Sequence, residues 1–321
     1  MITRSTVLLL AVYVTAMMGQ EAPSAAPVVQ TSAQIRAAAA KSGFVGNTGC
    51  RNCHKHDAIW NSFPQNPHFQ AKNGCESCHG AGQAHVDAGG DIDTVVRPFS
   101  LLKPAEIVAS CLSCHAKEFN RANIRRSEHT NHDVACTSCH SIHNAKSTRN
   151  LLAKKDEREL CYQCHTDVRS QFDLPSKHRV NEGLMSCSDC HNPHGGATPT
   201  AGMGQSSKML NKSHTSEQPC MKCHVDKRGP FVFAHQAGEV DGCTTCHKPH
   251  GSTTSKLLTR PTVTMQCQEC HTGSGNFGTR NNRGITTPDH ANHSMVDPRY
   301  QRCTGCHVAI HGSNVHYRFL R

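Results

Sequence analysis

All twenty cysteines of this chain lie in ten copies of one pattern, Cys-x-x-Cys-His. Two thiols at this spacing can add to the two vinyl groups of a haem, and the histidine that follows is then held beneath the iron as an axial ligand. A zinc ribbon or a disulfide scaffold also uses paired cysteines, but neither requires a histidine after every second cysteine. The pattern therefore predicts ten covalently attached haem c groups, and we call it the haem motif.

The ten haem motifs supply the predicted haem-binding cysteines and one axial histidine for each iron. The cysteines are Cys50, Cys53, Cys75, Cys78, Cys111, Cys114, Cys136, Cys139, Cys161, Cys164, Cys187, Cys190, Cys220, Cys223, Cys243, Cys246, Cys267, Cys270, Cys303 and Cys306. The axial histidines, which we call motif histidines, are His54, His79, His115, His140, His165, His191, His224, His247, His271 and His307.

The haem motifs fall into five units of two. Each unit contains, in order, a first haem motif, a histidine that we call the mid-unit histidine, a second haem motif, and a histidine that we call the trailing histidine. A Leu-Leu or Met-Leu pair precedes each unit after the first. The predicted units 1 to 5 are residues 50–100, 111–150, 161–210, 220–258 and 267–321. Linear repetition of this kind favours an elongated molecule in which each unit contacts its neighbours.

Each iron has a second axial position, and the repeat offers one further histidine for each. The predicted second ligands are His68, His85, His132, His143, His178, His194, His235, His250, His293 and His311. In unit 2 His129 is an equal alternative to His132, and in unit 5 His290 is an equal alternative to His293. Three isolated histidines are expected to be surface residues: His56, His214 and His316.

A trailing histidine such as His250 lies only three residues after its motif histidine, His247. This stretch of chain is too short to reach easily round to the opposite face of the same haem. We therefore expect trailing histidines to bind a neighbouring haem, without specifying which one. The terminal units depart from this spacing, since six residues separate His85 from its motif histidine and four separate His311 from its own.

Two imidazoles saturate an iron, so no substrate binds it and the iron only changes its oxidation state. Its potential is then set by the ligands, by burial and by nearby charge. Ten haems on 321 residues must lie close together, and close haems exchange electrons by hopping. The sequence thus favours an electron carrier without a substrate site of its own.

The composition is that of a chain with a poor protein core. Apolar residues make up 36% of the sequence, aromatic residues make up 5%, and Trp60 is the one tryptophan. Ten porphyrins are large, flat apolar bodies that can form the core instead. Cofactor binding and folding are then coupled, so we expect the haem-free chain to be largely unfolded.

The formal net charge of +10 would by itself suggest a nucleic acid or an anionic membrane as partner. Each haem, however, brings two propionates, and ten ferric haems would bring the oxidised protein close to neutrality. Many of the 34 Lys and Arg residues are then propionate partners or solvated surface. We accordingly predict no nucleic-acid binding.

The N-terminus has the layout of a secretory signal peptide. A positive charge at Arg4 precedes an apolar run over residues 7–18, which is too short for a comfortable membrane span. The prediction is a signal peptide over residues 1–19 with cleavage between 19 and 26, a flexible lead-in over 20–48, and a haem-binding domain over 49–321. Such a chain is exported to the periplasm.

Alternating strands are absent from the sequence, and the segments after several second motifs are rich in turn residues. Helices are predicted over residues 32–41, from Pro104 into Cys111, and over residues 154–160; proline suits a first helical turn. The fold class is therefore a mostly irregular and α-helical multihaem cytochrome c fold. Short helices and long loops surround a linear array of ten haems, with little or no β-structure.

The extended motif Cys-x-x-Cys-His-x-Pro-His-Gly at Cys187 and Cys243, with the haem count and the length, resembles the decahaem cytochromes of the DmsE/MtrA type. The resemblance covers residues 49–321. It implies a periplasmic protein associated with the outer membrane and plugged into a β-barrel porin. It also implies a periplasmic or inner-membrane cytochrome as donor and an extracellular multihaem cytochrome or terminal reductase beyond, in metal reduction or, in the opposite direction, iron oxidation.

Two other functions stay open at the level of sequence. A multihaem oxidoreductase of the nitrite or hydroxylamine type would leave one iron open, and some of these families place a lysine where the motif histidine stands. Here every motif ends in histidine, and further histidines are in surplus. A free periplasmic electron shuttle would carry the same haems without a porin.

Overall fold

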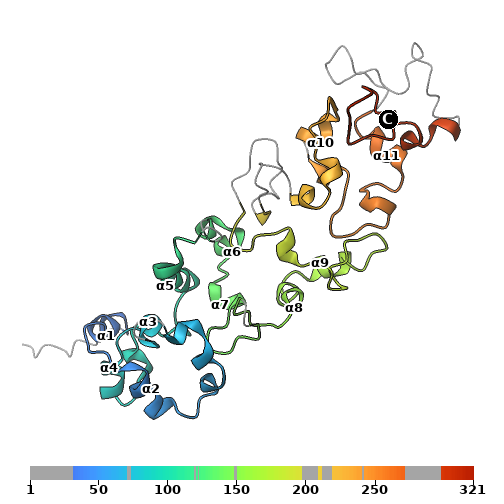
Figure 1. Ribbon diagram of the computed structural model, residues 1–321. Coiled ribbons are helices and arrows are strands. Elements are labelled where there is room, and N and C mark those ends of the chain that lie inside the picture. Colours follow the sequence, from blue (N-terminus) through green and yellow to red (C-terminus); the bar gives the residue numbers. More distant parts are fainter. Residues whose placement is uncertain are drawn as a thin grey trace, which may run out of the picture.

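The computed structural model describes residues 32–70, 74–118, 121, 123–147, 150–196, 209–211, 219–240, 242–271 and 298–321. Figure 1 shows an elongated molecule whose chain advances from one end to the other, with helices α1–α4 at one end and α10 and α11 at the other. The units thus follow one another in space as they do in the sequence. The predicted signal peptide, His214, His290 and His293 lie outside the described residues.

Short helices make up most of the regular structure, as the sequence predicts. The α-helices are α1 (Ser32–Ala39), α2 (Gly46–His54), α3 (Glu76–His79), α4 (Gln83–Asp87), α5 (Pro104–His115), α6 (Glu128–Asn131), α7 (Cys136–Cys139), α8 (Glu157–Cys161), α9 (Thr166–Gln171), α10 (Gln236–Val240) and α11 (Val263–Gln268). The strands β1 (Phe233–Ala234) and β2 (Gly312–Ser313) form one antiparallel pair, so the expectation of little β-structure is confirmed.

Single turns of 3₁₀-helix fill many of the connections. They are η1 (Ala58–Asn61), η2 (Phe63–Gln65), η3 (Pro67–Gln70), η4 (Ile92–Thr94), η6 (Ile124–Arg126), η7 (Cys187–Asp189), η9 (Pro219–Lys222), η10 (Val225–Lys227), η11 (Cys243–Thr245), η12 (Ser255–Leu257), η14 (Pro298–Tyr300) and η15 (Cys303–Gly305). Several of them lie within haem motifs, where a tight turn brings the two cysteines and the histidine to one side.

The three predicted helices are present. Pro104 begins α5, where its fixed φ and missing N–H suit the first turn, and the helix continues through the third haem motif to His115. Helix α8 begins three residues later than predicted, because the Asp156 carboxylate caps it by accepting the backbone N–H of Arg158 (2.8 Å). Helix α1 ends two residues before its predicted end.

Within a unit, the first motif packs against the second. Helix α5 carries the third motif and packs against α7, which carries the fourth. Helix α8 leads into the fifth motif and packs against η7 in the sixth, and α11 packs against η15 in the same way in unit 5. The two motifs of a unit are therefore neighbours in space as well as in sequence.

The segment that closes a unit returns to its second motif. Isolated antiparallel bridges join His140 to Leu152, His191 to Leu210 and His247 to Leu258. Three of the four pairs noted in the sequence therefore lie beside second motifs, where Leu152, Leu210 and Leu258 are half-buried. This position suits residues that pack against a cofactor.

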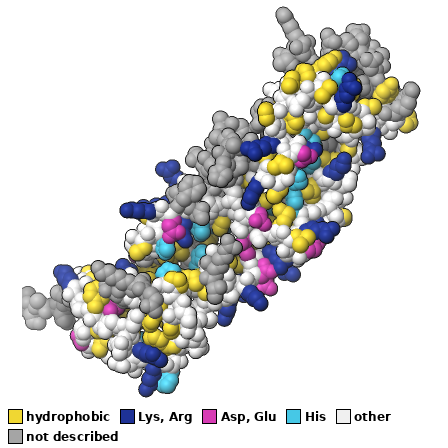
Figure 2. All heavy atoms as spheres, in the orientation of Figure 1, with side chains coloured by type: hydrophobic (Ala, Val, Ile, Leu, Met, Phe, Trp, Pro, Cys, Tyr) yellow, Lys and Arg dark blue, Asp and Glu magenta, His cyan; other side chains and the backbone are white. Residues whose placement is uncertain are grey.

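Among the described residues, Val108, Leu112 and Ile124 form a small cluster of buried apolar side chains, with Cys136 packed beside it. Figure 2 shows histidine side chains along the middle of the elongated molecule, while Lys and Arg gather mainly at its edges. Within the described ranges, no helix combines the length and the apolar character needed to cross a membrane.

Candidate haem-binding sites

Motif histidines face histidines from outside the haem motifs, which we call distal histidines. Nine such pairs occur among the described residues, with ring centres 5.9 to 6.4 Å apart. The pairs are His54–His85 (6.4 Å), His68–His115 (5.9 Å), His79–His143 (5.9 Å), His129–His165 (6.2 Å), His140–His194 (6.0 Å), His178–His224 (6.2 Å), His191–His250 (6.0 Å), His235–His271 (6.3 Å) and His247–His311 (6.1 Å).

The spacing within these pairs suits a single iron between two imidazoles. Metal–nitrogen bonds to histidine are about 2.0 Å long, so two imidazoles on opposite sides of one ion have ring centres about 6 Å apart. Each pair also has the two cysteines of its motif next to it in sequence. The residues present therefore fit a covalently attached haem, which when bound supplies an iron that gains and loses one electron.

The pairing follows one rule at every junction between units. The mid-unit histidine of one unit faces the first-motif histidine of the next, and the trailing histidine of that next unit faces the second-motif histidine of the one before. Between units 3 and 4, for example, His178 faces His224 while His250 faces His191. Each junction thus holds two reciprocal pairs.

This rule explains the position of the trailing histidines and adds a feature that the sequence did not reveal. The sequence led us to expect that trailing histidines serve a neighbour, and the structure places His250 beside the second motif of the preceding unit. The forward reach of the mid-unit histidines was not predicted. Spacing along the chain carries no signal for it, because it depends on how whole units stack.

The N-terminal unit departs from the rule, and residues 1–49 contain no haem motif. Its trailing histidine, His85, faces His54 of the same unit. His85 lies on α4, which packs against α1 and η4, and its Nδ1 donates to the carbonyl of Asp91 (2.9 Å). The unusual position of His85, six residues after His79, therefore accompanies a different partner: His85 faces a motif histidine of its own unit, whereas the other trailing histidines face one in the preceding unit. At the other end, the candidate partners of His307 lie outside the described residues.

In unit 2 the structure brings His129, rather than His132, to a motif histidine. The His129 ring centre lies 6.2 Å from that of His165. His132 instead turns back on its own helix end, where its exposed ring donates from Nδ1 to the carbonyl of Glu128 (2.7 Å). His129 is the second residue of α6 and His132 follows its end, so the two side chains leave the helix in different directions.

Desolvation favours the neutral form of many of the paired imidazoles, which is the form that coordinates a metal. Burial is the largest cause that lowers the pKa of the half-buried His68, His79, His115, His140, His191, His194, His235 and His250. For His194 the pKa falls to about 4, with a smaller contribution from His140.

Backbone carbonyls orient the second-motif histidines through their Nδ1 atoms. His79 donates to Arg97 (3.3 Å), His140 to Asn150 (2.7 Å), His247 to Lys256 (2.8 Å) and His307 to Arg318 (2.6 Å). A proton on Nδ1 leaves the lone pair of Nε2 for a metal, so these bonds fix the tautomer and the direction of the ring.

Three of these carbonyls precede a residue with a left-handed backbone. Leu151, Leu257 and Phe319 have φ values of 52°, 59° and 59°, a conformation that costs a residue with a side chain about 1 kcal/mol or more. Their own carbonyls accept the N–H of a residue that follows the second-motif histidine by one or two positions. The strained turn therefore recurs where the segment that closes a unit is hydrogen-bonded to the residues that follow the second-motif histidine.

Some distal histidines are oriented by the neighbouring unit. His129 Nδ1 donates to the carbonyl of Pro193 (3.0 Å), and His178 Nδ1 donates to that of Pro249 (2.7 Å). Both prolines directly precede a trailing histidine of the next unit. The x-Pro-His segment thus has two roles: its proline carbonyl accepts a hydrogen bond from one distal histidine, and its own histidine is the distal histidine of another pair. The role of the carbonyl was not predicted from the sequence.

At the first junction a side chain performs this task. The Asn66 amide donates to the carbonyl of Ile142 (2.8 Å), which directly precedes the trailing His143, and its oxygen accepts from His68 Nδ1 (3.0 Å). At the next two junctions the carbonyl before the trailing histidine accepts directly from the distal ring. At this junction the Asn66 amide bridges that carbonyl and the His68 ring. Ser62 adds a second bond across this junction, to the carbonyl of His143 (2.9 Å).

Glycine after a trailing histidine allows the backbones of two units to touch. A Cβ atom on Gly251 would lie 1.9 Å from the carbonyl oxygen of Gln171, and the bridge between Ser176 and Ser252 lies beside this contact. Gly195 occupies the matching place at the preceding junction, with a φ of 100°. The His-Gly sequence is thus explained by close approach of the preceding unit.

Comparison with known proteins agrees with this geometry. The chain matches the doubled Cys-x-x-Cys-His motif over residues 129–170 and 235–276 and the cytochrome c554 and c-prime family over residues 94–141. It is 33% identical over 283 residues to the multihaem cytochrome MtrA of Shewanella baltica, which covers 84% of this chain and 79% of the relative. The chain belongs to the MtrA family of multihaem c-type cytochromes.

Two more distant relatives are multihaem cytochromes as well. Cytochrome c-type protein NrfB of Escherichia coli is 30% identical over 130 residues, or 39% of this chain and 68% of NrfB. The polyhaem cytochrome OmcB of Geobacter sulfurreducens is 26% identical over 243 residues, or 67% of this chain and 27% of OmcB. As a member of the MtrA family, the chain is an electron-transfer protein that carries covalently attached haem c.

In this MtrA-family chain the first cysteines of the two motifs in a unit lie close together. The Sγ atoms of Cys161 and Cys187 lie within 4.8 Å of each other. The nearby thiols of Cys50, Cys111 and Cys220 lower the pKa of Cys75, Cys136 and Cys243, respectively, to about 7. The attachment points of the two haems in a unit are therefore adjacent.

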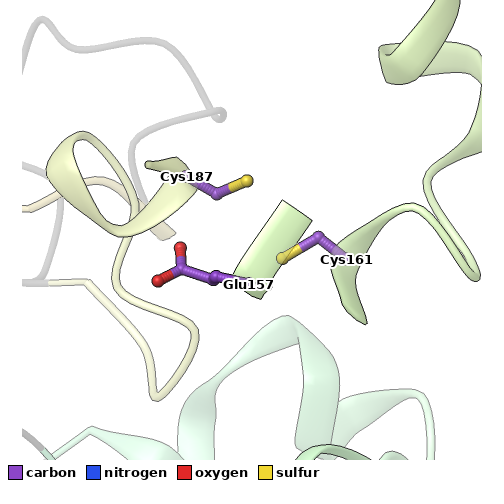
Figure 3. A group of neighbouring side chains, drawn as sticks. All are labelled: Glu157, Cys161 and Cys187. Carbon is purple, nitrogen blue, oxygen red and sulfur yellow. The ribbon is translucent and has the colours of Figure 1, made fainter. Parts of the chain in front are cut away.

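One of these thiol pairs lies beside a carboxylate, which gives the outline of a metal site. The ligand atoms of Glu157, Cys161 and Cys187 lie within 4.8 Å of one another (Figure 3). The Glu157 oxygens already accept the N–H (2.7 Å) and the hydroxyl (2.9 Å) of Ser188. Both thiols belong to haem motifs, and the bonds to Ser188 show that this carboxylate holds the sixth motif against α8.

Proposed function

We propose that this cytochrome binds ten haems, each between two histidines, and passes electrons along them from one end of the molecule to the other. The observation that carries the proposal is the set of nine facing histidine pairs, each of which joins a motif histidine to a distal one. The distal ligand of unit 2 is His129, and the tenth iron takes His307 with His290 or His293.

The order of the haems along the array follows the order of the motifs. Within a unit the first cysteines lie close together, as Cys161 and Cys187 do, and between units the second motif lies beside the next first motif. Burial raises the pKa of Cys78, and the nearby Cys114 thiol of the next unit raises it further; Cys164 affects Cys139 in the same way. Attachment points that succeed one another without a gap support stepwise transfer along the chain.

With all positions filled by imidazole, the protein has no open iron and works as a carrier. We propose that it acts in the periplasm at the outer membrane, where a β-barrel porin holds it and lets electrons cross to an extracellular multihaem cytochrome or a terminal reductase. The elongated shape (Figure 1) and the likeness to multihaem cytochrome MtrA support this placement. A periplasmic or inner-membrane cytochrome is its partner on the near side.

Two measurements test the haem array. Mass spectrometry of the mature holoprotein should give the mass of the chain plus ten haems, and the oxidised protein should show only low-spin absorption that nitrite and hydroxylamine do not perturb. A high-spin band, or a Soret shift with nitrite, would instead indicate an open iron and support a multihaem oxidoreductase.

Reconstitution tests the conduit. Liposomes that contain the holoprotein with a candidate β-barrel porin, and that enclose a reduced dye, should lose dye absorbance when a membrane-impermeant ferric chelate is added outside. Liposomes with the porin alone are the control for leakage of the dye. Equal rates in both preparations would contradict the conduit and leave a free periplasmic shuttle as the better description.

A further inference from the structure

The Nδ1 partners of the motif histidines divide into two chemical classes. Second-motif histidines such as His140 and His247 donate to neutral backbone carbonyls. Two first-motif histidines instead donate to carboxylates: His54 to Asp57 (2.8 Å), and His115 to Glu118. Both carboxylates belong to the two N-terminal units, and both stand three residues after the motif histidine.

The other first motifs lack this arrangement. The residues three places after the motif histidines of units 3, 4 and 5 are Val168, Lys227 and Ser274, none of which can carry a negative charge. Among the described residues, no carboxylate is hydrogen-bonded to the rings of His165, His224 or His271. The difference between the two halves of the chain is thus present in the sequence as well as in the contacts.

A carboxylate at Nδ1 changes the ligand more than a carbonyl does. It draws the Nδ1 proton toward itself, which makes the imidazole a more basic donor at Nε2. A more basic ligand, with a negative charge one hydrogen bond away, stabilises the ferric ion relative to the ferrous ion. Ligand basicity and nearby charge are among the main determinants of the potential of a haem iron.

We propose that Asp57 and Glu118 lower the reduction potentials of the haems bound by His54 and His115, and so make the N-terminal end of the array its low-potential end. The inference rests on the proposed ligation of these two haems. Asp57 and Glu118 touch a ligand rather than an iron, so they are positioning residues. Electrons then run downhill in energy from unit 1 toward unit 5.

The two carboxylates are not equivalent. The second oxygen of Glu118 forms an ion pair with Arg121, whose positive charge offsets part of the negative charge beside His115. Apart from its contact with His54, Asp57 forms no ion pair with a Lys or Arg side chain among the described residues. The larger effect therefore belongs to Asp57, at the terminal haem.

The test compares two double variants of the full-length holoprotein. D57N/E118Q removes both bonded carboxylates and leaves amides of the same size. D167N/D226N removes two carboxylates that lie two residues after first-motif histidines without bonding to them, so it is matched in charge. Potentiometric titrations followed at the Soret band, together with electron paramagnetic resonance of samples frozen at each potential, report the lowest potentials.

We expect D57N/E118Q to shift the reduction equilibrium of its lowest-potential haems about tenfold, or about 59 mV upward for one electron, with D57N alone giving more than half of the change. D167N/D226N should leave the low-potential end of the titration unchanged. Asp57→Glu, which keeps a carboxylate, should retain a low potential.

Two outcomes would overturn the proposal. Equal shifts in both double variants would show a general charge effect, and no shift in either would show that the carboxylates do not tune these haems. The haem content and the low-spin spectrum of each variant are measured on the same samples. If the parent protein itself lacked low-spin haem at these motifs, the proposed ligation would fail rather than the tuning.

Discussion

The N-terminal unit and the interior units hold their distal histidines in different ways. Unit 1 completes its first site by itself, since His54 and His85 both belong to it. An interior site always combines two units, as His191 of unit 3 does with His250 of unit 4. The histidine pair at the N-terminal end is therefore formed within one unit, whereas the histidine pairs of the interior are the main connection between units.

The hydrogen bonds that hold the sites in place also lie within the N-terminal region for unit 1 but between units in the interior. In unit 1 the buried Glu76 carboxylate accepts the N–H groups of Val45 (3.0 Å), Gly46 (2.9 Å) and Gly82 (2.7 Å), which tie the start of α2 to the start of α4. At the interior junctions, backbone carbonyls and glycine contacts take this place. Mutation of Glu76 should therefore weaken contacts near unit 1, whereas mutation of residues at an interior junction should weaken the contacts between two units.

The largest effect is expected from removal of distal histidines. His250→Ala should convert one haem to a high-spin state and lower the free energy of unfolding by about 2–5 kcal/mol, because it opens a site shared by two units. His85→Ala should also produce one high-spin haem but cost only about 1 kcal/mol, because every junction stays intact. Absorption spectra and denaturant unfolding measure both. Equal losses of stability in the two variants would contradict the comparison.

A smaller loss is expected from Gly251→Ala at the junction of units 3 and 4. The added methyl group would overlap the carbonyl oxygen of Gln171, and overpacking of this kind costs about 1–3 kcal/mol. The control is Gly238→Ala on α10, where no atom lies within 4 Å of the new Cβ and the helix should gain about 0.5–1 kcal/mol. Thermal unfolding followed by Soret circular dichroism tests the pair; similar transitions would show that the backbones need not touch.

Glu76→Gln should weaken unit 1 alone. An amide keeps one acceptor oxygen but loses the charge that strengthens three backbone hydrogen bonds, so we expect a loss of about 1–3 kcal/mol. Hydrogen exchange should increase at Val45, Gly46 and Gly82 and stay unchanged beyond unit 1. Glu106→Gln is the control, because that carboxylate is exposed and caps only its own helix. Faster exchange throughout the chain would show that unit 1 is not independent.

The smallest effect concerns Asp156, which caps α8 just before unit 3. Hydrogen bonds from Arg158 lower the pKa of this carboxyl below its usual value, so the stabilisation is present above a pH of about 4 and is lost as the pH falls through the folded-state pKa. Asp156→Asn should cost at most about 1 kcal/mol near neutral pH, since the pair is partly exposed. The difference from the parent protein should vanish in acid. A difference independent of pH in urea unfolding would assign it to helix capping instead.

The sequence predicts the chemistry of the sites better than their assembly. The haem motifs, the helix that begins at Pro104 and the multihaem fold follow from residue types and spacing. The choice between His129 and His132 does not, because both stand at one short helix, and only the contact with His165 of the next unit distinguishes them. The roles of Asn66 and Gly251 likewise depend on atoms more than seventy residues away.

Reciprocal exchange of ligands at the junctions has a consequence for how such proteins change in length. An interior unit gives one imidazole forward and one backward, and it receives one from each side. Duplication or loss of a whole unit therefore leaves the balance of irons and ligands unaltered, provided that the two ends keep their own closing histidines. Cytochromes of different span can arise from the same block without any new coordination chemistry.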